Sequence, residues 1–202
     1  YLAAWAKEIV EKKIPTVNML GCHDGIPLLD LKGLLPKEEI QSLIDRIVSR
    51  GGMVKNLHGQ KNLYYQVNAT YYSALGASDE KMLLARAIQM FMPGKPQVWY
   101  LDLFAGKNDH EAVRRAGESG HKEINRTNLS TDQITEGLKK DVVQKQLALI
   151  RMRNTHKAFS EGAEVAISGG ERSLEIRWEY NSAFATLYVN FESGTYTIVE
   201  SK

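Results

Sequence analysis

His23 and Asp24 are the residues of this sequence that most readily suggest chemistry. An imidazole and a carboxylate directly follow the apolar stretch "NMLGC" and directly precede Gly25. A charged group at the end of a buried strand costs free energy unless another group binds it. The pair therefore predicts either a hydrogen-bonded structural corner or a functional site, and the two residues alone do not decide between these alternatives.

Two other polar segments contain residue types that suit the binding of a sugar. They are "HGQKNLYYQVNATYYSALG" and "LDLFAGKNDHEAVRRAGESGHKEINRTNLS". Aromatic rings cover the C–H faces of a sugar, while amides and carboxylates bind its hydroxyl groups. Tyr71 and Tyr72 could equally be core residues at the start of a helix, so both interpretations stay open for them.

The second of these segments also contains candidates for binding ions. His110 and His121 lie near Asp109 and Glu118, but their spacing matches no standard set of metal ligands, and we expect neither a metal nor a cofactor. Arg126 has no obvious acidic neighbour in the sequence. Its guanidinium group suits a phosphate or a carboxylate, and an ordinary solvated surface arginine is the alternative.

Helices and strands alternate in the part of the chain that contains these segments. Helical spacing of apolar residues, with capping and terminating residues, predicts helices near 2–12, 36–50, 78–92 and 130–159. Apolar runs predict buried strands at "TVNMLGC" and "PQVWYLDLF", and the residues after them predict long loops at 53–66 and 106–129. From Ala163 the period changes to two, which predicts a small antiparallel sheet.

Two strands that are each followed by a loop-rich insertion and a helix are typical of the last units of a (β/α)₈ barrel. Residues 1–159 are too few for a whole barrel of roughly 250 residues. We therefore expect an α/β fold, with the C-terminal units of a (β/α)₈ TIM barrel at 1–159 and an antiparallel β domain at 160–202. The chain begins in a helical pattern at Tyr1, so we expect it to be a piece of a longer protein.

The overall composition argues against several classes of partner. The formal net charge is +2 and no run of five like charges occurs, so we expect no nucleic acid and no membrane surface as a partner. Cys22 is the single cysteine, and no signal peptide or long apolar stretch is evident, which favours the cytoplasm. Composition does not decide the oligomeric state, and a homodimer is an open alternative.

Four segments taken together resemble a known family. "NMLGCHDGI", "YYQVNATYYSALG", "PQVWYLDLFAGKND" and "INR" resemble, in this order, the C-terminal part of the sucrose phosphorylases and their relatives in glycoside hydrolase family 13. The resemblance implies a retaining glucosyltransferase. Such an enzyme forms a covalent glucosyl-aspartate and then transfers the glucosyl group to inorganic phosphate, which yields α-glucose 1-phosphate.

The resemblance also implies roles for particular residues. Asp24 matches the family's transition-state stabiliser, and His23 then binds hydroxyl groups of the glucosyl ring. Tyr65 and Gln66 match the mobile acceptor loop. Arg126 matches an arginine that contacts phosphate or the acceptor sugar.

The chemistry fits an ionised Asp24, because an oxocarbenium-like transition state carries more positive charge than the bound α-glucoside. Retaining chemistry further needs a nucleophile and an acid/base carboxyl about 5 Å apart. In the family both lie on earlier strands, upstream of this sequence. We therefore expect this chain to lack both and to be inactive in isolation.

Three departures from the family pattern leave the acceptor open. Pro27 follows "HDGI" where glycine is usual, Leu63 replaces an acidic residue, and "GHKEINRTNL" replaces "GRDINRHYY". Loss of the acid, with His58, Lys61 and His121 nearby in the sequence, suits an anionic acceptor such as a sugar phosphate. The alternatives to sucrose are thus sucrose 6-phosphate, glucosylglycerol and glucosylglycerate.

Two functions from other classes compete with this interpretation. A metal-dependent His-Asp phosphohydrolase would need further histidine and aspartate ligands on helices, whereas His23 and Asp24 follow a predicted strand. A non-catalytic module that contacts carbohydrate would need no further carboxylates. An upstream continuation with an aspartate and a glutamate at strand ends would favour the enzyme.

Overall fold

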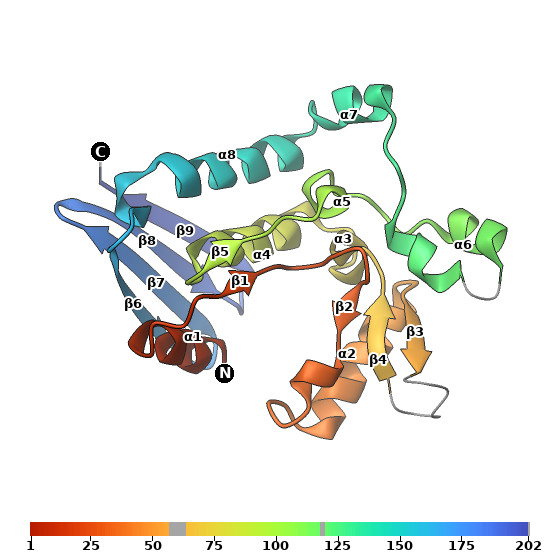
Figure 1. The fold of residues 1–202 in the computed structure, drawn as a ribbon, viewed down its shortest axis with the longest axis horizontal. Helices are drawn as coiled ribbons and strands as arrows, with labels where there is room; N and C mark the ends of the chain where they lie inside the picture. Colours follow the sequence, from red (N-terminus) through yellow and green to blue (C-terminus); the bar gives the residue numbers. More distant parts are fainter. Residues whose placement is uncertain (57–63, 118–119, 202) are drawn as a thin grey trace. The chain divides into compact units, whose positions relative to one another are not determined.

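The structure is a computed structural model that describes residues 1–56, 64–117 and 120–201 (Figure 1). Its contacts divide the chain into two compact units. The first unit comprises Tyr1–Met19, Leu83–Gln97 and Gln144–Lys202, and the second comprises Leu20–Met82 and Val98–Val143. These units do not test the predicted domain boundary between residues 159 and 160, which stays a prediction. Among the described residues, no helix combines the length and the apolar character needed to cross a membrane.

The first unit contains the C-terminal sheet that the period of two predicts. Four antiparallel strands pair in the order β6-β7-β8-β9 (Figure 1). Alternate side chains of β7 are buried, and the indole of Trp178 donates a hydrogen bond of 2.6 Å to the carbonyl of Phe91. The elements assigned to this unit are α1 (Leu2–Glu11), β1 (Val17–Asn18), β5 (Lys95–Pro96), η4 (Lys157–Phe159), β6 (Glu164–Gly169), β7 (Ser173–Tyr180), β8 (Ala183–Asn190) and β9 (Thr195–Glu200).

The two strands predicted for the barrel are much shorter than expected. β1 and β5 pair in parallel, as successive strands of a barrel do, but each contains two residues. The predicted burial is wrong, because Val17 and Met19 are 59% and 44% exposed. In the described residues β1 and β5 form a two-stranded sheet, so each strand has one ladder partner instead of the two that an inner strand of a barrel has. The α/β class and the terminal sheet are confirmed, whereas the assignment of β1 and β5 to the C-terminal units of a (β/α)₈ barrel stays a prediction.

The second unit contains a three-stranded sheet in the order β2-β4-β3. The loop predicted at 53–66 is wrong at both of its ends, because Met53–Asn56 pairs antiparallel with Tyr64–Asn68, while residues 57–63 lie outside the described residues. β3 is short and its pairing register shifts between Lys55 and Asn56. Such a shift interrupts the alternation of buried and exposed side chains, so the sequence shows no clear period of two. The elements are β2 (Ile26–Pro27), η1 (Leu29–Leu31), α2 (Lys37–Ser49), β3 (Met53–Asn56), β4 (Tyr64–Asn68), α3 (Tyr71–Ala74), α5 (Tyr100–Leu103), α6 (His110–Ala116), η3 (Gly120–Asn125) and α7 (Thr131–Gly137).

α2 packs its apolar residues into the core of the second unit. Ile44 and Ile47 belong to a buried cluster with Val67 of β4. Leu43 and Val48, which the periodicity also placed in the apolar stripe, are 36% and 41% exposed. The buried face of α2 is therefore narrower than the sequence predicts.

The helix predicted at 78–92 is present, whereas the helix predicted at 130–159 is divided into two. α4 (Asp79–Phe91) begins after Ser78, whose hydroxyl accepts a hydrogen bond from the amide of Lys81. The capping box of Ser130 and Gln133 is present at α7. The long helix predicted for 130–159 is divided, however, because α7 ends at Gly137 and α8 (Asp141–Thr155) follows separately.

The segment predicted as the polar loop 106–129 contains α6 and η3, and Tyr100–Leu103 of the predicted strand 96–104 forms the helix α5. The carboxylate of Asp109 caps α6 by accepting from the amide of Ala112. None of the residues described for α6 is buried, so this helix has no apolar period from which to be predicted.

Candidate functional site

His23 and Asp24 occupy a tight turn that precedes β2. The amide of Gly25 donates to the carbonyl of Cys22 at 3.0 Å, and the amide of Asp24 lies 3.4 Å from the Cys22 sulfur. Gly25 has a φ of 102°, and a Cβ atom at this position would collide with the carbonyl oxygen of Val67. The structure therefore fixes the backbone of the pair as a structural corner while both side chains stay accessible.

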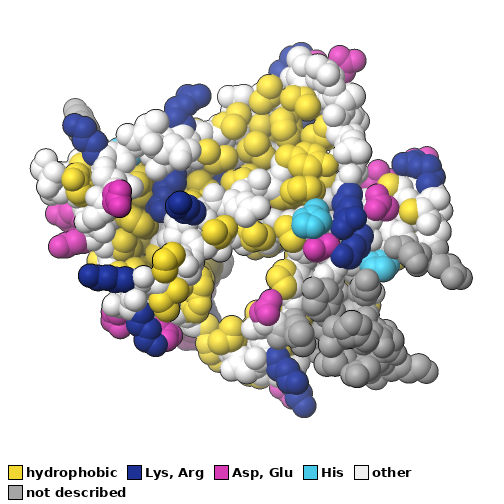
Figure 2. All heavy atoms as spheres, in the orientation of Figure 1, with side chains coloured by type: hydrophobic (Ala, Val, Ile, Leu, Met, Phe, Trp, Pro, Cys, Tyr) yellow, Lys and Arg dark blue, Asp and Glu magenta, His cyan; other side chains and the backbone are white. Residues whose placement is uncertain are grey.

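The accessible side chains are available to a ligand. The side chains of His23 and Asp24 are 58% and 40% exposed. Figure 2 shows a histidine together with acidic and basic side chains on the surface of the face in view. The exposure is compatible with a binding role as well as with a structural corner.

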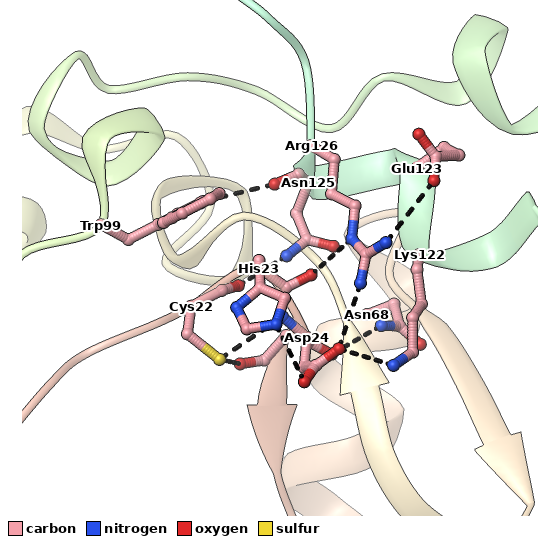
Figure 3. A network of polar contacts seen from close by, with 10 residues as sticks. Cys22, His23, Asp24, Asn68, Trp99, Lys122, Glu123, Asn125 and Arg126 are labelled. Atoms are coloured by element: carbon pink, nitrogen blue, oxygen red, sulfur yellow. Dashed lines mark hydrogen bonds and ion pairs between the residues drawn. The ribbon is translucent and has the colours of Figure 1, made fainter.

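The carboxylate of Asp24 lies among basic groups (Figure 3). Its Oδ1 atom is 2.5 Å from Nζ of Lys122 and 3.1 Å from Nη2 of Arg126, and its Oδ2 atom is 3.3 Å from Nε2 of His23. The hydrogen bond from Lys122 is the largest cause that lowers the pKa of Asp24, and the charges of Lys122, His23 and Arg126 act in the same direction. Asp24 is therefore ionised at neutral pH.

Arg126 donates to two acceptors that are distant in the sequence, and it lies near one acid that is three residues away. Its Nε atom donates to the carbonyl of His23 at 3.0 Å, and its Nη2 atom donates to Asp24. Its Nη1 atom lies 3.8 Å from Oε1 of Glu123, which is beyond hydrogen-bond distance. The lack of acidic neighbours expected from the sequence is thus wrong, because the fold supplies Asp24 from 102 positions away.

Buried amides hold the surrounding backbone in place. Nδ2 of Asn68 donates to the carbonyl of Asp24, and Nδ2 of Asn125 donates to the carbonyl of Cys22, both at 2.7 Å. Both asparagines are fully buried. They connect the turn to β4 and to η3, so that the orientation of Asp24 is set by two other elements of the same unit.

Sequence reasoning missed Lys122 and Trp99 as residues of this site. The indole of Trp99 donates to the carbonyl of Asn125 at 3.3 Å, and its ring centroid lies 6.0 Å from that of His23. Trp99 thus presents an aromatic surface beside His23, as carbohydrate sites commonly do. A signal for Lys122 existed in the altered "GHKEINR" segment, but an ion pair across 98 positions leaves no local pattern.

Tyr65 and Gln66, predicted to bind substrate, lie in β4. Gln66 pairs with Pro27 in the ladder and is 3% exposed, and its Nε2 atom has no hydrogen-bond partner among the described residues. No described contact joins Gln66 to Asp24. The roles predicted for Tyr65 and Gln66 stay predictions, and His58, Lys61, Leu63 and Glu118 lie outside the described residues.

The other candidates have structural partners. Asp109 accepts from Ala112 and from the hydroxyl of Thr127, and the Ala112 bond is the main cause that lowers its pKa. In the part of the chain that the structure describes, no group of three His, Cys, Asp or Glu side chains could hold a metal ion.

Tyr72 is a core residue, as in one of the two interpretations that the sequence leaves open. The Tyr72 side chain is buried and its hydroxyl donates to Asp79 at 2.7 Å. Burial raises its pKa to about 12.

Similar proteins were found by comparison of the sequence and of the structure. A sucrose 6(F)-phosphate phosphorylase of Ilumatobacter coccineus is 53% identical over 98% of this chain, and a glucosylglycerol phosphorylase of Marinobacter adhaerens is 37% identical over 92%. The crystal structure of sucrose 6F-phosphate phosphorylase from Thermoanaerobacter thermosaccharolyticum matches 92% of the chain with a TM-score of 0.85 and 38% identity. No protein-family model matches the chain. The chain spans 39–40% of the length of these relatives.

Proposed function

The homologues of this chain are sucrose 6(F)-phosphate phosphorylases and related glucoside phosphorylases, and from this relationship we propose that it forms part of a retaining glucoside phosphorylase. The reaction we propose transfers a glucosyl group from an α-glucoside to inorganic phosphate and yields α-glucose 1-phosphate. The observation that carries the proposal is the ionised carboxylate of Asp24, held at an accessible turn between Lys122, Arg126 and His23.

Asp24 would stabilise the transition state electrostatically. The transition state of glycosyl transfer carries positive charge on the sugar ring, so a fixed carboxylate binds it more tightly than the neutral substrate. The Oδ1 atom is already occupied by Lys122 and Arg126, which leaves Oδ2 and the imidazole of His23 to face the hydroxyl groups of the sugar. The ring of Trp99 would border the same space.

Arg126 would bind the phosphate that accepts the glucosyl group, or a charged acceptor. The structure shows only one long contact for its Nη1 atom, which lies 3.8 Å from Oε1 of Glu123. This donor is therefore available to a ligand. A planar guanidinium group is well suited to a phosphate oxygen. The position after the last predicted barrel strand is also a region where barrel enzymes often bind phosphate.

The nucleophile and the acid/base carboxyl would come from a part of the enzyme outside this chain. Retaining chemistry needs these two carboxyls about 5 Å apart, and Asp24 fills neither role in this proposal. The relatives are more than twice as long as the matched region, which leaves room for both residues. We therefore propose that the chain contributes to a composite site and does not turn over substrate alone.

Among donors, we propose sucrose 6F-phosphate before sucrose. The relative with 53% identity acts on sucrose 6(F)-phosphate by its name, whereas a relative named sucrose phosphorylase is 38% identical. The basic character around Asp24 is compatible with an anionic acceptor. Sucrose and glucosylglycerol are the next candidates, because a sucrose phosphorylase is 38% identical and a glucosylglycerol phosphorylase is 37% identical. A cytoplasmic location and a homodimer remain predictions.

The test is an assay of the enzyme that contains this chain, incubated with inorganic phosphate and one donor at a time. The donors are sucrose 6F-phosphate, sucrose, glucosylglycerol and glucosylglycerate, and the readout is the release of glucose 1-phosphate. We expect the highest kcat/KM with sucrose 6F-phosphate. Binding of these glucosides without phosphate-dependent release of glucose 1-phosphate from any of them would support the non-catalytic module instead.

A further inference from the structure

Lys122 is the basic residue closest to the carboxylate of Asp24. Lys122 lies in the 3₁₀ helix η3, and its ammonium nitrogen is 2.5 Å from Oδ1 of Asp24. The Nη2 atom of Arg126 is 3.1 Å from the same oxygen (Figure 3). The Lys122 side chain is 29% exposed, so the contact is partly shielded from water. Partial shielding strengthens an ion pair relative to one between fully solvated side chains.

The two cations at Asp24 differ in what else they bind. Within the described residues, Asp24 is the one hydrogen-bond partner of the Lys122 ammonium group. Arg126 instead distributes its donors between Asp24, the carbonyl of His23 and the more distant Glu123. The ammonium group of Lys122 is therefore committed to the carboxylate, while the guanidinium group of Arg126 is shared.

We propose that Lys122 is the positioning residue of this site, which orients the carboxylate of Asp24 and so leaves Arg126 with a donor for an anionic ligand. The role of Lys122 in catalysis rests on the proposed phosphorylase function. The groups that face Asp24 are His23 from the same turn, Lys122 and Arg126 from η3 and the residue after it, and the amide of Asn68 from β4 at the Asp24 carbonyl. Glu123 is the nearby acid, and it lies on the far side of Arg126.

This division of roles makes a specific prediction about geometry. Lys122 and Arg126 both contact Oδ1, so Oδ2 stays directed towards His23. Without Lys122 the carboxylate would keep only the 3.1 Å hydrogen bond from Arg126 and the 3.3 Å contact with His23, and it would rotate more freely. Misplacement of a catalytic group by about 1 Å lowers a rate by up to about 100-fold.

The test measures the pKa of Asp24 directly, by NMR titration of its side-chain carboxyl carbon in the enzyme that contains this chain. The variants are Lys122→Met, which removes the charge, Lys122→Gln, which keeps a hydrogen-bond donor, and Lys122→Arg, which restores the charge. Lys139→Met is the matched control, because Lys139 pairs with Glu136 on the exposed side of α7. Amide spectra identify the variants that fold.

We expect the pKa of Asp24 to rise in Lys122→Met and in Lys122→Gln, to return towards the original value in Lys122→Arg, and to stay unchanged in Lys139→Met. An unchanged pKa in either folded neutral variant would overturn the proposal. Since this titration uses no activity, it tests the ion pair between Lys122 and Asp24 even if the enzyme proves not to be a phosphorylase.

A second measurement separates positioning from direct binding of an anion. In the enzyme that contains this chain, Lys122→Met should lower kcat by roughly 10- to 100-fold and leave the KM for inorganic phosphate nearly unchanged. Lys122→Arg should recover most of the rate. A KM for phosphate that rises more than tenfold at an unchanged kcat would make Lys122 an anion-binding residue and would contradict the positioning role.

Discussion

Arg126 and Arg153 are both partly buried arginines, but their guanidinium groups have different partners. Arg153, in the first unit, donates to the carbonyls of Met90 and Gly94, each at 3.0 Å, and its Cζ atom lies 4.2 Å from the ring centroid of Trp178 and 4.8 Å from that of Phe159. Burial lowers its pKa to about 10, so it remains charged at neutral pH.

Arg126 contacts two carboxylates in addition to one carbonyl, that of His23. It shares Asp24 with Lys122, and its Nη1 atom has only the 3.8 Å contact with Glu123. An arginine whose donors bind carbonyls and whose faces are covered by aromatic rings has little left for a ligand and serves stability. An arginine that shares a partly exposed carboxylate and keeps a donor can serve binding. The predictions below test this difference.

Replacement of Arg153 by methionine should have the largest effect on stability. The change keeps an apolar side chain but removes two charge-assisted hydrogen bonds and the cation–π contacts, and it leaves two carbonyls without their donor. The expected loss is about 2–4 kcal/mol in the free energy of unfolding, measured by urea denaturation. Arg151→Met, an exposed neighbour on α8, should cost no more than about 0.5 kcal/mol. Equal losses for the two variants would remove the distinction drawn for Arg153.

Replacement of Arg126 should affect the use of phosphate. Arg126→Ala should lower kcat/KM for phosphate by about 10- to 150-fold, which corresponds to about 1.5–3 kcal/mol, while transfer of the glucosyl group to water stays comparatively intact. Arg126→Lys keeps the charge without the planar fork, so it separates bidentate binding from simple attraction. Arg115→Ala, which breaks an exposed pair with Glu111, is the control. Normal phosphate kinetics in both Arg126 variants would make this residue an ordinary surface arginine.

The smallest expected effect is the response of stability to acid. The pKa of Asp24 is lowered in the folded chain, mainly by the hydrogen bond from Lys122, so its contribution to stability is present above the unfolded pKa of about 3.9. This contribution is lost as the pH falls through the lowered pKa. Because the side chain is 40% exposed, we expect the loss to be small.

The measurement for this effect is the urea midpoint between pH 6 and pH 2. Asp24→Asn should flatten the acid limb slightly, whereas Arg153→Met should shift the whole curve without changing the limb. An acid limb that is identical with and without Asp24 would show that its ion pairs do not form in solution.

The sequence predicted those elements whose own residues specify them. Ser78 and the Ser130–Gln133 capping box mark helix starts, and the alternation from Ala163 onwards marks the terminal sheet. It failed where tertiary contacts decide the structure. The β3–β4 hairpin is short and irregular, and α6 buries none of its described side chains, so neither carries a readable period.

The candidate site was predictable only in part for the same reason. The sequence identifies His23, Asp24 and Arg126 as candidates because they lie in segments that resemble a known family. The fold brings Arg126 to the other two across more than 100 positions. Lys122 was missed because its partner is equally distant and because a lysine in a polar segment is normally solvated. Trp99 was assigned to a strand, although its aromatic ring lies beside His23.

Asp24→Asn in the enzyme that contains this chain tests the central claim most directly. Asparagine keeps the size and the hydrogen-bonding capacity of the side chain but removes the charge that would stabilise the transition state. With sucrose 6F-phosphate and inorganic phosphate as substrates, kcat for the release of glucose 1-phosphate should fall by at least about 100-fold while the fold, monitored by circular dichroism, is unchanged. A kcat within a few-fold of the unmodified enzyme would contradict the account, because it would remove Asp24 from the catalytic residues.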